Sequence, residues 1–375
     1  MSLIDLEPAK ARAGQLFCSC DGENAAEDGV AERPALMQIA LGFGLTVIVQ
    51  SLYVAVLPIA GAEITEQPAL ATLPYALTLV GALAASLPAA MLTDVFGRKS
   101  AFALGASLGL AGACLAAWSI SERQFAGLAL GSFWLGVAQG FGFFFRHSAA
   151  LAAENKAKAI AIVLGAGSLA AIAAPALLSV AQSTAGPLAP AAALLLAGAA
   201  QIVLLALCLA LPGKSIAAAR APQAIRIDGI YLWATLAGAL AWLGMALMMA
   251  GSPGLMAGCG IGLAGRSEVI SWHILAMYAP AAILGLLLPN PRGEIFCALG
   301  VVLLAGAIAV LTKLTSFLDF GLVLIVAGSG WSLTMFGATL MVHAKGALSR
   351  PLLALHDAAL FGGAIAGAMA AAFLR

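Results

Sequence analysis

The sequence predicts an all-α integral membrane protein built from two groups of spanning helices. Three observations support this: 62% of the 375 residues are hydrophobic, only 9% are charged, and the mean hydropathy is +1.03. A soluble domain has about 25% charged residues, so we expect membrane lipid around this chain. The net charge of +1 lacks the basic footprint of a nucleic-acid-binding protein. We also expect no enzyme, because the sequence offers no nucleophile–base set and no hydrophilic catalytic domain.

Apolar runs long enough to cross a bilayer follow one another along most of the chain. A spanning helix needs about 20 such residues. The predicted spans are 36–60, 68–92, 101–120, 125–145, 159–182 and 188–212, then 231–250, 269–288, 295–312, 317–341 and 351–374. The predicted domains are therefore a disordered cytoplasmic tail (1–34), a six-helix bundle (35–212), a cytoplasmic linker (213–230) and a five-helix bundle (231–375).

Positive charges are distributed unequally between the two sides of this topology. With the N-terminus inside, the inner segments hold fourteen Lys and Arg residues and the outer segments hold four. The outer four are Arg123, Arg266, Lys313 and Arg375. Cytoplasmic loops of membrane proteins carry the excess of Lys and Arg. We therefore expect a multi-pass protein with a cytoplasmic N-terminus.

A short polar stretch separates the second and third predicted spans. Residues 90–102 read A-M-L-T-D-V-F-G-R-K-S-A-F, and a turn glycine with two cations suits a short cytoplasmic loop. The stretch resembles the signature loop of the major facilitator superfamily, G-x-L-A-D-R-x-G-R-K-x-x-L, although Ala90 replaces the first Gly and Val95 the first Arg. The matching residues are Leu92, Asp94, Gly97, Arg98 and Lys99. The resemblance implies a gating role for Asp94, Gly97, Arg98 and Lys99.

This resemblance implies a transporter of two six-helix repeats, but the two halves here differ in length. Residues 36–212 make 177 and residues 231–375 make 145, so we expect the twelfth helix to be missing. The C-terminus is then expected on the outer face, and a membrane protein partner could occupy the twelfth position. We also expect Asp94 to dock on the N-terminus of the last helix, which begins near Pro351; an ion pair with Arg98 is the alternative.

Soft side chains recur at helical spacing on the seventh and eighth predicted helices. Met245 and Met249 form M-x-x-x-M, and His273 and Met277 form H-x-x-x-M. A spacing of four puts each pair on one helical face, and thioether with imidazole favours Cu(I) over hard cations. Methionine is also a common filler of apolar cores, so the alternative for these residues is ordinary packing.

A second resemblance favours the metal interpretation. The run 267–280, S-E-V-I-S-W-H-I-L-A-M-Y-A-P, is similar to the eighth helix of the CcoA-type copper importers, and the runs 140–150 and 330–333 also resemble that branch. In that branch the two motifs above bind the metal. The resemblance implies copper as the transported ion, no organic cofactor, alternating-access import across the bacterial inner membrane, and supply of copper for haem-copper oxidase assembly. Residues 280–285 depart from that branch, which has an aromatic pair there.

Further residues are weaker candidates. His356 and Asp357 lie within the eleventh span, where ionisable groups are costly and often functional; they are interpreted as a proton-coupling pair or as a buried structural pair. Cys18, Cys20 and Cys259 are candidate accessory copper ligands, with incidental or packed thiols as the alternative. His343 is interpreted as an exit ligand or, more simply, as a histidine at the edge of a loop.

Two other functions stay open. The first is transport of a small organic solute such as a flavin, because relatives of this branch include flavin carriers; an aromatic-lined cavity would favour it. The second is a non-transporting membrane subunit or assembly factor, which the missing twelfth helix would favour.

Overall fold

The computed structural model describes residues 32–67, 70–212, 227–345 and 348–374, and every regular element in these ranges is a helix. The first half contains α1 (Glu32–Ile64), α2 (Leu73–Val95), α3 (Gly97–Ser121), α4 (Phe125–Phe143), α5 (Phe145–Ala152), α6 (Lys156–Ala166), α7 (Ala170–Ala185) and α8 (Ala189–Leu209). The second half contains α9 (Gly229–Gly258), α10 (Leu263–Leu287), α11 (Gly293–Val310), α12 (Phe317–Val342) and α13 (Arg350–Ala370).

The helices account for the predicted crossings. Ten stretches of the described chain are long and apolar enough to span a membrane, and the longest, Lys156–Leu209, has 54 residues. At 1.5 Å per residue a single helix of that length would be about 80 Å long, against a hydrocarbon core of about 30 Å. The chain turns back between α7 and α8, where Gly186 has a φ of +52° and Pro187 follows. This stretch is therefore two spans, which gives eleven crossings as predicted.

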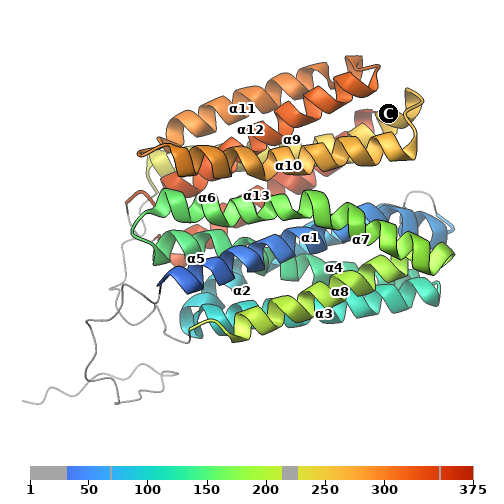
Figure 1. Ribbon diagram of the computed structural model, residues 1–375, viewed down its shortest axis with the longest axis horizontal. Helices are drawn as coiled ribbons and strands as arrows, with labels where there is room; N and C mark the ends of the chain where they lie inside the picture. The colour runs from blue at the N-terminus through green and yellow to red at the C-terminus, as the bar shows by residue number, and fades with distance from the viewer. Residues whose placement is uncertain (1–31, 68–69, 213–226, 346–347, 375) are drawn as a thin grey trace, which may run out of the picture.

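The helices pack as two groups that meet along the middle of the molecule (Figure 1). Within the first group α4 packs on α2 and α3, and α8 on α1 and α3; within the second, α9 packs on α12 and α13, and α12 on α10 and α11. Contacts between the groups run along α2 with α13, α6 and α7 with α10, and α5 with α12. The predicted linker between the bundles is 213–230, and residues 213–226 of it lie outside the described residues, so the domain boundaries stay a prediction.

The two ends of the helical bundle differ in charge. The start of α1 and the end of α13 lie at opposite ends of the molecule (Figure 1), in line with an odd number of crossings. Among the described cations, the end where α1 begins carries Arg98, Lys99, Arg146, Lys156, Lys158, Arg292, Lys345 and Arg350, and the opposite end Arg123, Arg266 and Lys313. We call these the inner and the outer end; their placement relative to the membrane follows from the positive-inside rule.

The loop between α2 and α3 is as tight as its sequence predicts. Phe96 alone separates the two helices, and Gly97 has a φ of +80°, in the left-handed region that favours glycine. The side chain of Asp94 lies outside the described part of the structure. Its predicted docking on the start of α13, and the ion pair with Arg98, therefore stay predictions.

Helices of the first group approach closely through glycines. A Cβ at Gly136 of α4 would lie 2.0 Å from the carbonyl oxygen of Thr78 in α2. Small residues allow this backbone approach, which supports helix association in lipid, where the hydrophobic effect between helices is absent. At Gly306 of α11, by contrast, an added Cβ would meet no described atom of another helix within 4 Å.

Gly136→Ala is expected to force α2 and α4 apart and to destabilise the protein by about 1–3 kcal/mol, the usual cost of overpacking. Gly306→Ala is the matched control, and it should be neutral or stabilising by about 0.5–1 kcal/mol because alanine favours a helix. Thermal unfolding of both purified variants in detergent checks this. Equal melting temperatures for the two variants would contradict the packing argument.

The start of α9 is fixed by a carboxylate at its N-cap. The Asp228 side chain accepts a hydrogen bond of 2.9 Å from the backbone N–H of Tyr231 and one of 2.6 Å from Lys345 Nζ. The hydrogen bond from Lys345, and then the backbone N–H of Tyr231, lower the pKa of Asp228 below its usual value. A depressed folded-state pKa means that the pair stabilises the folded state above the unfolded pKa, about 3.9. This stability is lost as the pH falls through the folded-state pKa.

Lys345→Met should therefore make the melting temperature less sensitive to acid below about pH 4, near the unfolded pKa of aspartate. Asp228→Asn keeps a good N-cap but removes the titrating group, so it should flatten the acid response in the same way. Melting curves recorded between neutral pH and pH 3 measure the effect, which is small because the pair is exposed. Wild-type steepness in both variants would show that the pair does not contribute.

Candidate functional site between the two halves

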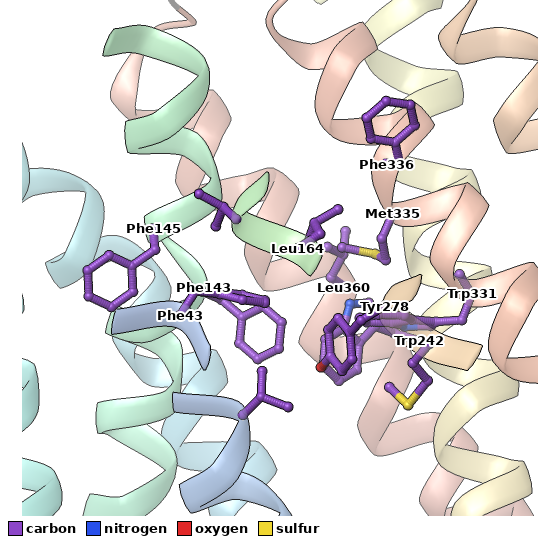
Figure 2. Close-up of a cluster of buried hydrophobic side chains, with 14 of the residues drawn as sticks. Phe43, Phe143, Phe145, Leu164, Trp242, Tyr278, Trp331, Met335, Phe336 and Leu360 are labelled. Atoms are coloured by element: carbon purple, nitrogen blue, oxygen red, sulfur yellow. The ribbon is translucent and has the colours of Figure 1, made fainter. Parts of the chain in front are cut away.

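Aromatic side chains fill the centre of the molecule, where helices of both halves meet (Figure 2). We call six of them the aromatic cluster: Phe43 of α1, Phe143 of α4, Trp242 of α9, Tyr278 of α10, Trp331 of α12 and Phe361 of α13. All six are 4% exposed or less. The cluster is thus assembled from six different spanning helices and closed to solvent in this conformation.

The rings contact one another across the boundary between the halves. Phe143 lies with its centroid 5.2 Å from that of Trp242 and 5.8 Å from that of Phe361, and Phe43 lies 5.9 Å from Tyr278. These pairs are edge-to-face, the arrangement that the ring quadrupoles favour. Within the second half, Trp331 lies 5.5 Å from both Trp242 and Tyr278. The halves therefore share one continuous aromatic core.

Several hydrogen-bond donors at or beside this core have no partner. Among the described residues, the indole N–H groups of Trp242 and Trp331 are buried and unpaired, as is the amide nitrogen of Gln139. Gln139 lies one helical turn before Phe143 on α4, and its side-chain oxygen accepts a hydrogen bond from the hydroxyl of Tyr53. Buried donors without acceptors are costly. Their concentration at one place suits a ligand that brings acceptors with it.

The predicted metal ligands lie nearer the outer end of α9 and α10. His273 is fully buried, its Nδ1 lies 2.6 Å from the carbonyl oxygen of Leu324, and its Nε2 lies 3.1 Å from the sulfur of Met245. The structure thus brings two of the four predicted ligands together. Met277 is buried and Met249 half-buried, each one turn further along its helix, so the four-ligand arrangement itself stays a prediction.

The structure does not place the candidate accessory thiols near the predicted metal ligands among the residues it describes. Cys259 is exposed at the end of α9, and its thiol lies 3.6 Å from the carbonyl oxygen of Leu314. Cys18 and Cys20 lie outside the described residues, so their role stays a prediction.

A buried polar cluster joins the halves near the inner end. Asp357 of α13 accepts a hydrogen bond of 2.5 Å from Arg146 Nη2 of α5 and lies 3.2 Å from His147 Nε2. His147 Nδ1 lies 2.9 Å from Nε2 of His343, the residue that ends α12. His356 Nδ1 lies 3.0 Å from the hydroxyl of Thr235. The charged and imidazole side chains of this cluster are 1% exposed or less.

Sequence reasoning found only part of this cluster. His356 and Asp357 were predicted to form a proton-coupling or structural pair. In the structure Asp357 bonds to Arg146 and His147 of α5, and His356 bonds to Thr235 of α9. The proton-coupling role itself stays a prediction. Arg146 lies one residue beyond the predicted span 125–145, yet it is buried. His343, interpreted as an exit ligand or a histidine at a loop edge, is buried too. The missed signal is that Asp357 within an apolar span needs an opposite charge, and Arg146 beside Phe143-Phe-Phe145 has the same need.

Comparisons with known proteins identify relatives with the same helical architecture. The family model described as "Sugar (and other) transporter" matches residues 38–180. The riboflavin transporter RfnT of Brucella anthropi is 31% identical over 294 residues, which cover 75% of this chain and 73% of that protein.

Among solved structures, the proton:xylose symporter XylE of the major facilitator superfamily aligns with a TM-score of 0.71 and 12% identity over 90% of this chain and 87% of its own. The human organic anion transporter MFSD10 aligns with a TM-score of 0.68 and 15% identity, covering 92% and 94%. A bacterial homologue of the iron transporter ferroportin in an outward-facing state aligns with a TM-score of 0.62 and 13% identity, covering 90% of each chain.

These findings confirm the predicted fold and the exclusion of an enzyme. They do not support the copper branch: the relative at 31% identity is a riboflavin transporter, which fits the organic-solute alternative better. The eleven crossings, the glycine turn between α2 and α3, and the relationship over three quarters of the chain lead to one conclusion. This chain is a membrane transporter of the major facilitator superfamily.

Proposed function

We propose that the protein imports a planar aromatic organic solute, such as a flavin, across the bacterial inner membrane by alternating access. The observation that carries the proposal is the aromatic cluster, which lies between the halves and leaves two indole N–H groups unpaired. The similarity to a riboflavin transporter supports it independently. In this proposal the N-terminus is cytoplasmic, as the distribution of cations favours.

The chemistry of a flavin matches the cluster in two ways. Its three fused rings can replace the edge-to-face contacts between the rings of the two halves with stacking contacts of similar strength. The pyrimidine edge of the ring system carries two carbonyl acceptors, which the N–H groups of Trp242 and Trp331 can satisfy. Binding then gives acceptors to two N–H groups that have no partner among the described residues, and this favours a solute with acceptors over one without.

Alternating access follows from where the cluster lies. The rings of Phe143 and Trp242 are in contact across the halves, so a solute can enter only when the halves separate at one end. The inner end is closed in this conformation by the buried cluster around Asp357. Release inside requires that cluster to open, with Arg98 and Lys99 rearranging in the loop between α2 and α3.

Trp242→Phe keeps an aromatic ring but removes one N–H donor, so we expect it to weaken riboflavin binding about tenfold, the equivalent of one lost hydrogen bond. The measurement is quenching of riboflavin fluorescence by the purified protein. Trp118→Phe is the matched control, because Trp118 is 51% exposed on the outside of α3. Equal affinities for both variants, or no riboflavin binding by the wild type, would contradict the proposal.

One observation keeps copper import as a second candidate function. If His273 donates from Nδ1 to the carbonyl oxygen of Leu324, its neutral ring leaves a lone pair on Nε2 facing the sulfur of Met245 at 3.1 Å. Two soft donors facing each other in a buried site suit Cu(I). A protonated His273 that donates to the sulfur is the alternative without a metal.

For this candidate, Met245→Leu and His273→Leu should abolish copper uptake into cells at matched membrane expression, because each removes one soft ligand. Met335→Leu is the control, as Met335 is a buried core residue of α12. Wild-type uptake by the two ligand variants would leave His273 and Met245 as a packing contact. The alternative of a non-transporting subunit, with a partner at the twelfth-helix position, rests only on the eleven crossings.

A further inference from the structure

In the buried polar cluster near the inner end, the side chains form a row of hydrogen bonds that all run in one direction. The proposed function does not depend on this direction. The row contains His147 between Asp357 on one side and His343 on the other, at 3.2 Å and 2.9 Å. A neutral imidazole has one donor nitrogen and one acceptor nitrogen. The order of donors along this row is therefore fixed once one end is known.

The ion pair between Arg146 and Asp357 fixes the acceptor at one end of this row. Asp357 accepts from Arg146 Nη2 at 2.5 Å, and both side chains are 1% exposed, so the carboxylate acts only as an acceptor. His147 must then donate from Nε2 and accept at Nδ1. His343 in turn must donate from Nε2, which leaves its Nδ1 as a bare acceptor. That atom is buried without a partner in the described part of the chain.

We propose that these three residues form a proton relay, in which Asp357 exchanges a proton with the inner side through His147 and His343. A proton that arrives at His343 Nδ1 is matched by transfer of the Nε2 proton of His343 to His147 Nδ1. The Nε2 proton of His147 then moves to Asp357. One proton enters and one is gained by Asp357, and the resulting tautomers again pair donor with acceptor at both contacts. Release to the inside is the same sequence reversed.

The position of the relay links proton binding to the contact between the halves. Arg146 and His147 belong to α5 of the first half. In the second half, His343 is the C-cap of α12 and Asp357 belongs to α13. Protonation of Asp357 removes the charge that pairs with Arg146 and leaves a buried cation uncompensated between the halves. The inner end is then favoured to open. Protonation from the inner side therefore controls opening of the inner end, whichever solute is carried.

Among the described residues, few other charged or titratable groups surround the relay. His356 of α13 lies with its ring 6.2 Å from that of His147 but hydrogen-bonds to Thr235. Tyr231 of α9 donates to the carbonyl oxygen of Leu352, and Lys156 of α6 donates to that of His343 at 2.7 Å. The side chain of Asp94, on α2 packed against α13, lies outside the described part of the structure. Of the described groups, His343 lies beside Lys156 at the inner end, so it is the entry point of the relay.

The test follows opening of the inner end without any solute. Glu154→Cys and Asn290→Cys, in the full chain with its native cysteines replaced by serine, place two fluorophores across a surface cavity that both residues line at the inner end. A rapid shift to acid pH should lower energy transfer between them as the halves separate. An infrared titration of the same protein should show a carboxylic-acid band that Asp357→Asn removes.

His343→Gln should reach the same end point after the acid shift but about 100-fold more slowly, because an amide cannot shuttle the proton. His356→Asn is the matched control and should respond at the wild-type rate. Since Asp357→Asn alone strands Arg146, the double variant Arg146→Gln/Asp357→Asn replaces the ion pair with a neutral one and should abolish the acid response.

The proposal is overturned by a wild type whose inner ends ignore acid, by wild-type kinetics in His343→Gln, or by a pH response that survives in the double variant. None of these readouts uses riboflavin, so failure of flavin binding and failure of the relay are distinguishable.

Discussion

The ion pair between Arg146 and Asp357 is the constraint on which the observed conformation depends. It joins residues 211 positions apart, from different halves, inside a part of the protein that excludes water. A buried pair returns little net stability over apolar residues of the same shape, but loss of one partner costs about 3–5 kcal/mol. Its physical value here is therefore conditional: it holds the inner ends together only while both charges are present.

The aromatic cluster has the complementary property. Its rings are held by dispersion and edge-to-face contacts, which are individually weak and can be exchanged for contacts with another planar group. The ion pair near the inner end is directional and all-or-none, whereas the cluster at the centre can exchange partners. A transporter needs both kinds of contact, since its solute must compete with the protein's own packing while the gate must have two distinct states.

Most of the fold was predictable from the sequence because a bilayer imposes lengths. Apolar runs of about 20 residues located the helices, and Gly97 marked the turn between α2 and α3. The limits of the prediction are equally physical. The position of Trp331 or His147 in the fold depends on which helical faces meet. Hydrophobic periodicity cannot identify those faces when nearly every face of a helix is apolar. Sequence motifs therefore singled out His273 and Met245, which do meet, while the aromatic cluster and Arg146 became visible only in three dimensions.

The edge-to-face contact between Phe143 and Trp242 has an optical consequence. Trp242 and Trp331 are two of the six tryptophans of this chain. Their ring centroids lie 5.5 Å apart, and both side chains are buried away from water. When the halves part, Trp242 loses the ring of Phe143 and gains water, so its emission must move to longer wavelength. The centre of the protein thus carries an intrinsic spectroscopic reporter of its own working cycle.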